Sequence, residues 1–133
     1  MAEWFAELEE QIFTQVDYML TLKPDAPFPN LTCTTANQNS KTVFPTLYLH
    51  ELEPVEAGQD LNNQSVNAVV ETIEIQVWTN ETEEICREIL SAAITEMKRM
   101  RFNVTGFPNV HTDNKIALGI ARFRRLIGQG DSL

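Results

Sequence analysis

The amino-acid sequence predicts an α+β fold in which two helices pack on one face of a mostly antiparallel sheet of four to five strands, with a long loop between the central strands. Two segments repeat apolar side chains every three or four positions, as amphipathic helices do, and a third alternates apolar and polar side chains, as a half-buried strand does. The order of these segments along the chain fits a layered α+β arrangement. The chain of 133 residues is expected to form one domain, residues 1–133.

Residues 2–20 form the first predicted helix. Its apolar stripe consists of Phe5, Leu8, Ile12, Val16 and Met19. Pro24 follows and ends it. Residues 30–35 favour a short strand. Residues 43–49 favour another, which is an edge strand or begins at Pro45, because proline cannot donate a ladder hydrogen bond.

Residues 50–67 predict the long loop, because they are polar, lack periodicity and include Pro54 and Gly58. Loops of this length in compact domains tend to be binding elements. We therefore expect this segment to be the assembly arm of the protein. The alternative is a surface loop without a partner.

Residues 69–79 give the clearest strand pattern, with Ile73, Ile75 and Val77 on one face. A second helix follows, because Asn80 and Glu83 have the spacing of a capping box at its start. The apolar stripe of this helix consists of Ile85, Ile89, Ala93, Met97 and Met100.

Three further segments complete the chain: a short strand, a turn and a final strand at 102–105, 106–114 and 115–127. The apolar alternation of the final strand changes phase between Ile120 and Phe123. A bulge near Ala121 or Arg122 would explain this change.

The formal net charge of −9 argues against the usual nucleic-acid binder, whose binding face carries a surplus of Lys and Arg. Residues 1–84 carry fifteen acids and two bases, whereas residues 85–133 carry four acids and eight bases. This asymmetry suits head-to-tail association of copies, and chance clustering on a solvated surface is the alternative. Arg122 and Arg124 share a face of the last strand, where they and Arg125 either pair with carboxylates of a neighbour or stay solvated.

The motifs of catalysis, metal binding and cofactor binding are missing from the sequence. Cys33 and Cys86 lie too far apart for a zinc or redox pair and are expected to be reduced thiols. Two histidines, His50 and His111, are too few for a three-histidine zinc site. The glycines near the C-terminus precede no helix that would receive a phosphate. We therefore expect no cofactor, no metal and no enzymatic activity.

The N-terminus shows no basic segment followed by an apolar run, so no signal peptide is expected. No stretch approaches the length of about 18 apolar residues that a membrane span needs. The sequence thus predicts a protein that is made in a cytoplasm and has no membrane partner.

Three segments resemble the tail terminator, or tail completion, family of long-tailed bacteriophages: VNAVVETIEIQVWTN at 66–80, MKRMRF at 97–102 and ARFRRLIGQGDSL at 121–133. The resemblance covers roughly residues 44–133, and the N-terminal helix fits by layout only. No catalytic motif belongs to it.

The resemblance implies a virion protein that forms a ring, typically of six copies, at the head-proximal end of the tail tube. Such a ring stops tube polymerisation and presents a surface to the neck. The implied partners are further copies of the chain, the tail tube protein and a neck or connector protein, while DNA only passes through the lumen. An acidic ring suits this passage, because negative walls do not hold phosphate.

The loop and the charge pattern lead us to expect an interface formed by Glu51, Glu53, Asp60, Asn62, Asn63, Trp78, Arg122, Arg124 and Arg125. The main alternative function is a neck connector or head-tail stopper of the same particle. A small cytoplasmic enzyme or regulator would need a convergent polar pocket. An acidic nucleic-acid mimic would need carboxylates at phosphate spacing, and the basic C-terminal third argues against it.

Overall fold

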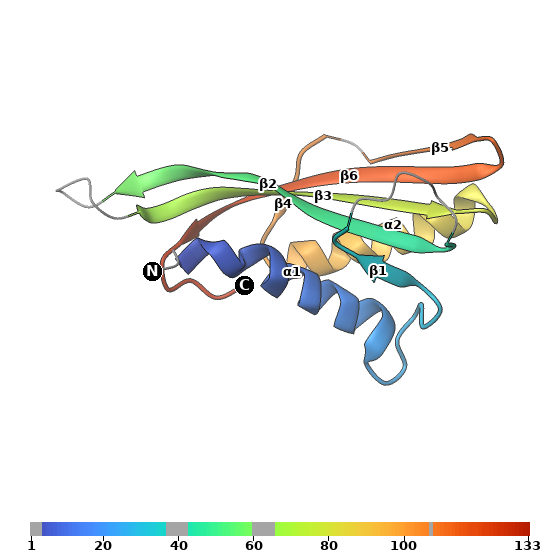
Figure 1. Cartoon of the computed structure of the whole chain (residues 1–133), viewed down its shortest axis with the longest axis horizontal. Coiled ribbons are helices and arrows are strands. Elements are labelled where there is room, and N and C mark those ends of the chain that lie inside the picture. The colour runs from blue at the N-terminus through green and yellow to red at the C-terminus, as the bar shows by residue number, and fades with distance from the viewer. Residues whose placement is uncertain (1–3, 37–42, 60–65, 107) are drawn as a thin grey trace.

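The computed structural model describes residues 4–36, 43–59, 66–106 and 108–133. In this part of the chain a six-stranded, mostly antiparallel sheet carries both helices on one face (Figure 1), which confirms the predicted α+β class with one strand more than the four to five expected. The strands are β1 Thr32–Thr34, β2 Thr46–Gln59, β3 Val66–Thr79, β4 Asn103–Val104, β5 Asn109–Asp113 and β6 Ile116–Gly128. Their order is β1-β2-β3-β6-β4, with β5 also paired to β6, and β1–β2 is the parallel pair.

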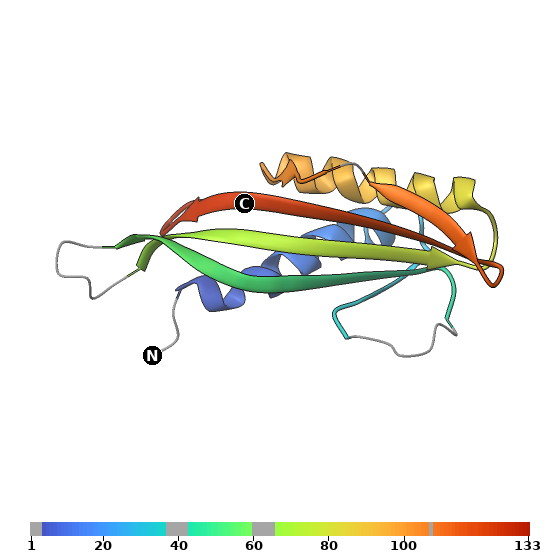
Figure 2. The ribbon, with the colours of Figure 1, turned by 90° about the horizontal axis from the view of Figure 1, so that it is seen from above.

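The first predicted helix is confirmed as a succession of three helical segments: a 3₁₀ turn Trp4–Glu7, the helix α1 Leu8–Asp17 and a π-helical turn Tyr18–Leu22. Its inner face buries Leu8, Ile12, Val16 and Leu20, which lie four positions apart. Figure 2 shows that α1 crosses obliquely under the sheet, from the β2 side at its beginning toward α2 at its end.

The second helix, α2, spans Glu83–Arg99, and its start differs from the sequence prediction. The N-cap is Thr82, which has extended backbone and whose hydroxyl accepts a hydrogen bond from the Ile85 amide at 3.2 Å. The predicted Asn80 cap is therefore wrong. Strand β3 continues to Thr79, so Asn80 still belongs to the bend between strand and helix.

The long loop predicted at 50–67 is also wrong, because β2 and β3 form one long antiparallel hairpin through most of it. The pairing runs from Thr46 opposite Trp78 to Gln59 opposite Val66, and a bulge after Leu52 accommodates Pro54. The hairpin extends beyond both helices (Figure 1). Residues 60–65, which join its strands, lie outside the described residues.

Two further predictions for the C-terminal part fail. Residues 109–113, predicted as part of a turn, form β5 and pair with β6. Strand β6 has no bulge against β3, since the register is continuous from Ala117 to Gly128. The apolar alternation changes phase because the first half of β6 has its small residues, Ala117, Gly119 and Ala121, on the side of the helices. The larger apolar residues between them lie half-buried on the other face.

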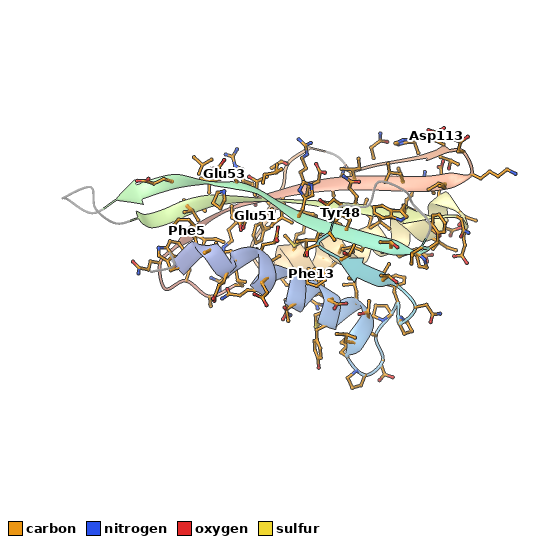
Figure 3. The ribbon with its side chains drawn as sticks, in the orientation of Figure 1. Phe5, Phe13, Tyr48, Glu51, Glu53 and Asp113 are labelled. Atoms are coloured by element: carbon orange, nitrogen blue, oxygen red, sulfur yellow. The ribbon has the colours of Figure 1, made fainter. Side chains whose placement is uncertain are left out.

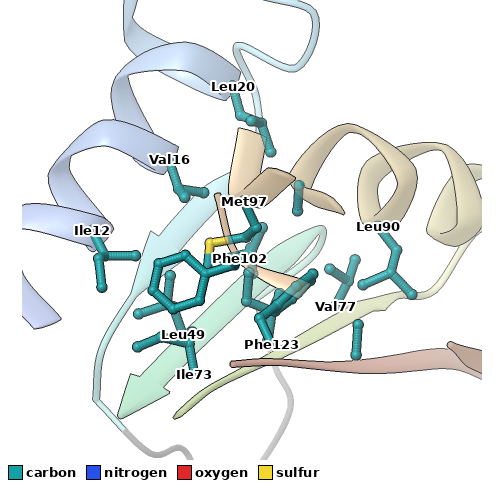
Figure 4. Close-up of a cluster of buried hydrophobic side chains, with 14 of the residues drawn as sticks. Ile12, Val16, Leu20, Leu49, Ile73, Val77, Leu90, Met97, Phe102 and Phe123 are labelled. Atoms are coloured by element: carbon teal, nitrogen blue, oxygen red, sulfur yellow. The ribbon is translucent and has the colours of Figure 1, made fainter. Parts of the chain in front are cut away.

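The core lies between the helices and the sheet (Figure 4). Ile12 and Val16 of α1 and Met97 of α2 pack with Ile73 of β3 and Phe123 of β6 in one cluster of buried side chains. Burying each such side chain contributes roughly 1.5–3 kcal/mol. The side of the sheet turned away from the helices is covered by neither helix, and we call it the open face.

Candidate interaction surface

The open face carries rows of side chains that run across β2, β3 and β6. One row joins His50, Glu74 and Arg122, and the next joins Leu52, Thr72 and Arg124. A third joins Val55, Val70 and Leu126 near the projecting end of the hairpin. The predicted sharing of one face by Arg122 and Arg124 is confirmed, and both are exposed.

The row that contains Glu74 is a closed polar network. His50 Nε2 lies 3.0 Å from Glu74 Oε1, and Arg122 Nε donates to Glu74 Oε2 at 2.7 Å. Burial alone would raise the pKa of Glu74, but the hydrogen bonds from His50, Gln76 and Arg122 outweigh it and lower this pKa to about 2. Tyr48 stacks on the His50 ring with centroids 4.9 Å apart. The Arg122 guanidinium is therefore engaged within its own chain.

A second acidic group lies on the other side of the sheet, beneath α1. Glu71 of β3 is fully buried there, and the described residues give neither of its carboxyl oxygens a hydrogen-bond partner. Burial raises the pKa of Glu71 far above 4.5, and the neighbouring carboxyls of Glu51 and Glu9 raise it further. Burial and the two neighbouring acidic side chains thus both favour the protonated form of Glu71.

Glu51 also connects β2 to the first helix. Beyond Tyr48 no other strand pairs with the outer edge of β2 in the described residues, and the Glu51 amide donates to Glu9 Oε2 of α1 at 2.8 Å. Figure 3 shows Glu51 between the sheet and α1, whereas Glu53 lies on the opposite side of β2. The helix thus covers part of an edge that would otherwise be open.

Exposed charge differs between the two sides of the sheet. On the β2 side the exposed acids are Glu7 and Glu10 of the first helical region and Glu53 and Glu56 of β2. Around β4 and the end of α2 the exposed bases are Lys98, Arg99, Arg101 and Arg124, whereas the exposed acids Glu84 and Glu88 of α2 and Asp113 of β5 lie farther along the same side of the sheet. Two open hollows lie among these bases. One of about 590 Å³ is lined by Lys98, Arg101, Phe102, Asn103 and Val104, and one of about 480 Å³ is lined by Val70, Asn103, Thr105, Arg124, Arg125 and Leu126.

The structure corrects two of the expected interface residues. Trp78 is 1% exposed and its indole Nε1 donates to the Val43 carbonyl at 3.2 Å. Arg125 is 7% exposed and donates to the carbonyls of Met100 and Ser132. Buried side chains of this kind have no surface to offer a neighbouring subunit. Trp78 is buried even though it faces away from the helices. Arg125 lies on the same face of β6 as the core residues Phe123 and Ile127.

The other expected residues fall into three groups. Glu53 and Arg124 are exposed, whereas Glu51 and Arg122 make contacts within the chain. Asp60, Asn62 and Asn63 lie outside the described residues. Sequence reasoning missed Val55 and Leu126, each 62% exposed. Leu126 carried a signal, because it is an apolar residue on the face that Arg122 and Arg124 occupy.

The described residues contain no group of three or more His, Cys, Asp or Glu side chains arranged to hold a metal ion. Cys33 and Cys86 are free thiols. Burial raises the pKa of Cys33 to about 12 and that of Cys86 to about 11, so neither is a reactive thiolate at neutral pH.

Among the described residues, no helix combines the length and hydrophobicity that a membrane crossing requires. The chain matches no protein-family model, and no curated protein matches its sequence.

Proposed function

We propose that this chain is a structural subunit of a long-tailed phage, a tail terminator that forms a ring at the head-proximal end of the tail tube. The ring ends polymerisation of the tube and joins the tail to the head. The observation that carries this proposal is the uneven distribution of exposed charge, with acids along β2 and a cluster of bases around β4 and the end of α2.

Opposite charge on opposite sides suits head-to-tail contact between identical subunits. Glu53 and Glu56 of one copy then meet Lys98, Arg101 or Arg124 of the next. A contact between two different surfaces repeats around a ring until it closes. The same arrangement in a face-to-face dimer with like sides together would bring like charges into contact.

The three segments that resemble the tail terminator family also support the proposal by their place in the fold. Strands β3 and β6 pair along their whole common length, and the end of α2 packs against them. These segments therefore make up one contiguous framework. The resemblance is consistent with a shared arrangement of strand, helix and strand.

A structural role also agrees with the state of the titratable groups. Glu74 is hydrogen bonded to His50 and paired with Arg122, Glu71 is closed off beneath α1, and the hollows beside β4 are open to solvent. An enzyme needs a catalytic group positioned where substrate can reach it. None of these groups meets both conditions.

The test is electron microscopy of particles from a producing strain in which this chain is deleted, with a complemented strain as the control. A terminator predicts overlong, irregular tails, because nothing ends the tube. Tails of normal length without heads would instead indicate a neck connector. Normal infectious particles would contradict any structural role in the tail.

A further inference from the structure

Two exposed apolar side chains lie on the projecting end of the sheet. Val55 of β2 and Leu126 of β6 flank Val70 of β3 in one cross-strand row on the open face. Val55 and Leu126 are each 62% exposed. A continuous apolar row that is left exposed on a sheet is a candidate contact surface for another protein.

The two ends of this row carry opposite charge. Glu53 lies beside Val55 on the β2 side, and Arg124 lies beside Leu126 on the β6 side. Both are exposed, and in the described part of the chain neither makes an ion pair. Arg122, one row away, differs because Glu74 already holds it.

The β6 end of the row also borders a hollow. Val70, Arg124 and Leu126 line the open hollow of about 480 Å³, together with Asn103 and Thr105 at the β4 side. At the β2 end, exposed Val55 stands on the edge strand of the sheet. One end of the row thus offers an exposed apolar side chain with an acid beside it, and the other offers a hollow with a base beside it.

We infer that the occupant of this hollow is a second copy of the chain: Val55 of one copy packs on Leu126 of the next, and Glu53 of the first pairs with Arg124 of the second. The contact joins two different surfaces, so each copy offers its β2 end to one neighbour and its β6 hollow to another, and the association is head-to-tail. This inference rests on the proposed function only in taking the association to close into a ring.

A pair of cysteines tests the contact directly. Val55 and Leu126 lie on strands separated by β3, so their Cα atoms in one chain are about 10 Å apart. That exceeds the roughly 7 Å limit for a disulfide, so V55C/L126C can form the bond only between copies. The experiment is mild oxidation of the purified chain, followed by a non-reducing gel.

The expected result is a ladder of covalent species beyond the dimer, which reducing agent collapses to the monomer. The matched control is L22C/V55C, because Leu22 is 67% exposed but lies at the end of the first helical region. It should remain monomeric, as should the natural chain, in which Cys86 is buried and Cys33 is half-buried. A monomer from V55C/L126C, or an equal ladder from the control pair, would overturn the inference, and a band that stops at the dimer would overturn the head-to-tail arrangement.

Charge exchange gives an independent measurement. In analytical sedimentation, R124E should weaken self-association by roughly tenfold or more, because two acids then face each other. The double variant E53R/R124E should restore self-association toward the natural level. K115E is the charge-matched control, since Lys115 lies at the opposite end of β6. Failure of the exchange to restore association would refute the Glu53 pairing. Tail length after deletion is a separate measurement, so the proposed function can survive that failure.

Discussion

Glu71 of β3 and Arg125 of β6 are direct cross-strand partners on the helix-facing side of the sheet, both are buried, and yet they form no ion pair in the structure. The Arg125 guanidinium donates instead to the Met100 carbonyl at 2.9 Å and the Ser132 carbonyl at 2.8 Å. It thereby ties the end of α2 and the C-terminal residues to the sheet. Glu71 is left as a buried carboxyl beside Glu51, where a negative charge is costly.

The first prediction concerns the pH dependence of stability that Glu71 causes. Its pKa is raised on folding, so the folded state holds a proton that the unfolded state releases above pH 4.5. The free energy of unfolding should therefore fall as pH rises from 4.5 through neutrality. Glu71→Gln should remove this slope and stabilise the protein at pH 7 by about 2 kcal/mol, measured by urea unfolding.

The control for this prediction is Glu56→Gln, which neutralises an exposed carboxyl on the same hairpin and should leave the slope unchanged. Equal pH profiles for the natural chain and Glu71→Gln would show that Glu71 is ionised in the folded state. That result would contradict a protonated, buried Glu71.

The Glu74 network predicts the opposite pH dependence. Its folded pKa is lowered to about 2, so its contribution is present above pH 4.5 and disappears as pH falls toward 2. Glu74→Gln should lower the free energy of unfolding at pH 7 by about 2 kcal/mol. Unfolding curves of Glu74→Gln and the natural chain should converge near pH 2, and a difference that persists there would point to packing rather than charge.

The cap of α2 gives a matched pair of variants. Thr82→Ala removes the hydroxyl that accepts from the Ile85 amide and should cost about 1 kcal/mol in the free energy of unfolding. Asn80→Ala should cost much less, because Asn80 is exposed and precedes the cap. Thermal or urea unfolding measures both costs. A larger cost for Asn80→Ala than for Thr82→Ala would instead support the capping box that the sequence suggests.

Close packing of α2 on β6 depends on Gly119. A Cβ placed there would lie 3.0 Å from Val110 Cγ2, 3.1 Å from Leu90 Cδ2 and 3.2 Å from Cys86 Sγ. Gly119→Ala should therefore destabilise the protein by about 1–3 kcal/mol, because the helix and β5 have to move together to make room. Urea unfolding measures this, and unchanged stability would mean that these neighbours adjust freely.

Periodicity explains which elements were predictable from the sequence. Ile12 and Val16, or Ile73 and Ile75, repeat at the spacing of a helix or a strand because one face of each element is buried. Strand β2 beyond Leu49 breaks that pattern, since its helix-facing position is Glu51 and its exposed positions include Val55. Tertiary pairing with β3 makes it a strand, and a single sequence does not display that pairing.

The candidate surface was predictable only in part for a related reason. The charge of Arg124 and its place on the same face as Arg122 could be read from the sequence, and the polar segment 50–67 pointed to Glu53. The burial of Trp78 and Arg125 could not, because it depends on contacts from distant segments. The row of Val55, Val70 and Leu126 depends on strand register, including the bulge after Leu52. A one-residue change in register would move Val55 to the other face.

The most direct measurement is the number of copies of this chain per purified phage particle, determined by quantitative mass spectrometry against the tail tube protein in particles of different tail length. A terminator ring predicts a small, fixed number of copies per tail that does not change with tail length. Copies that increase in proportion to tail length, or a chain that is missing from the particles, would contradict a ring at one end of the tail.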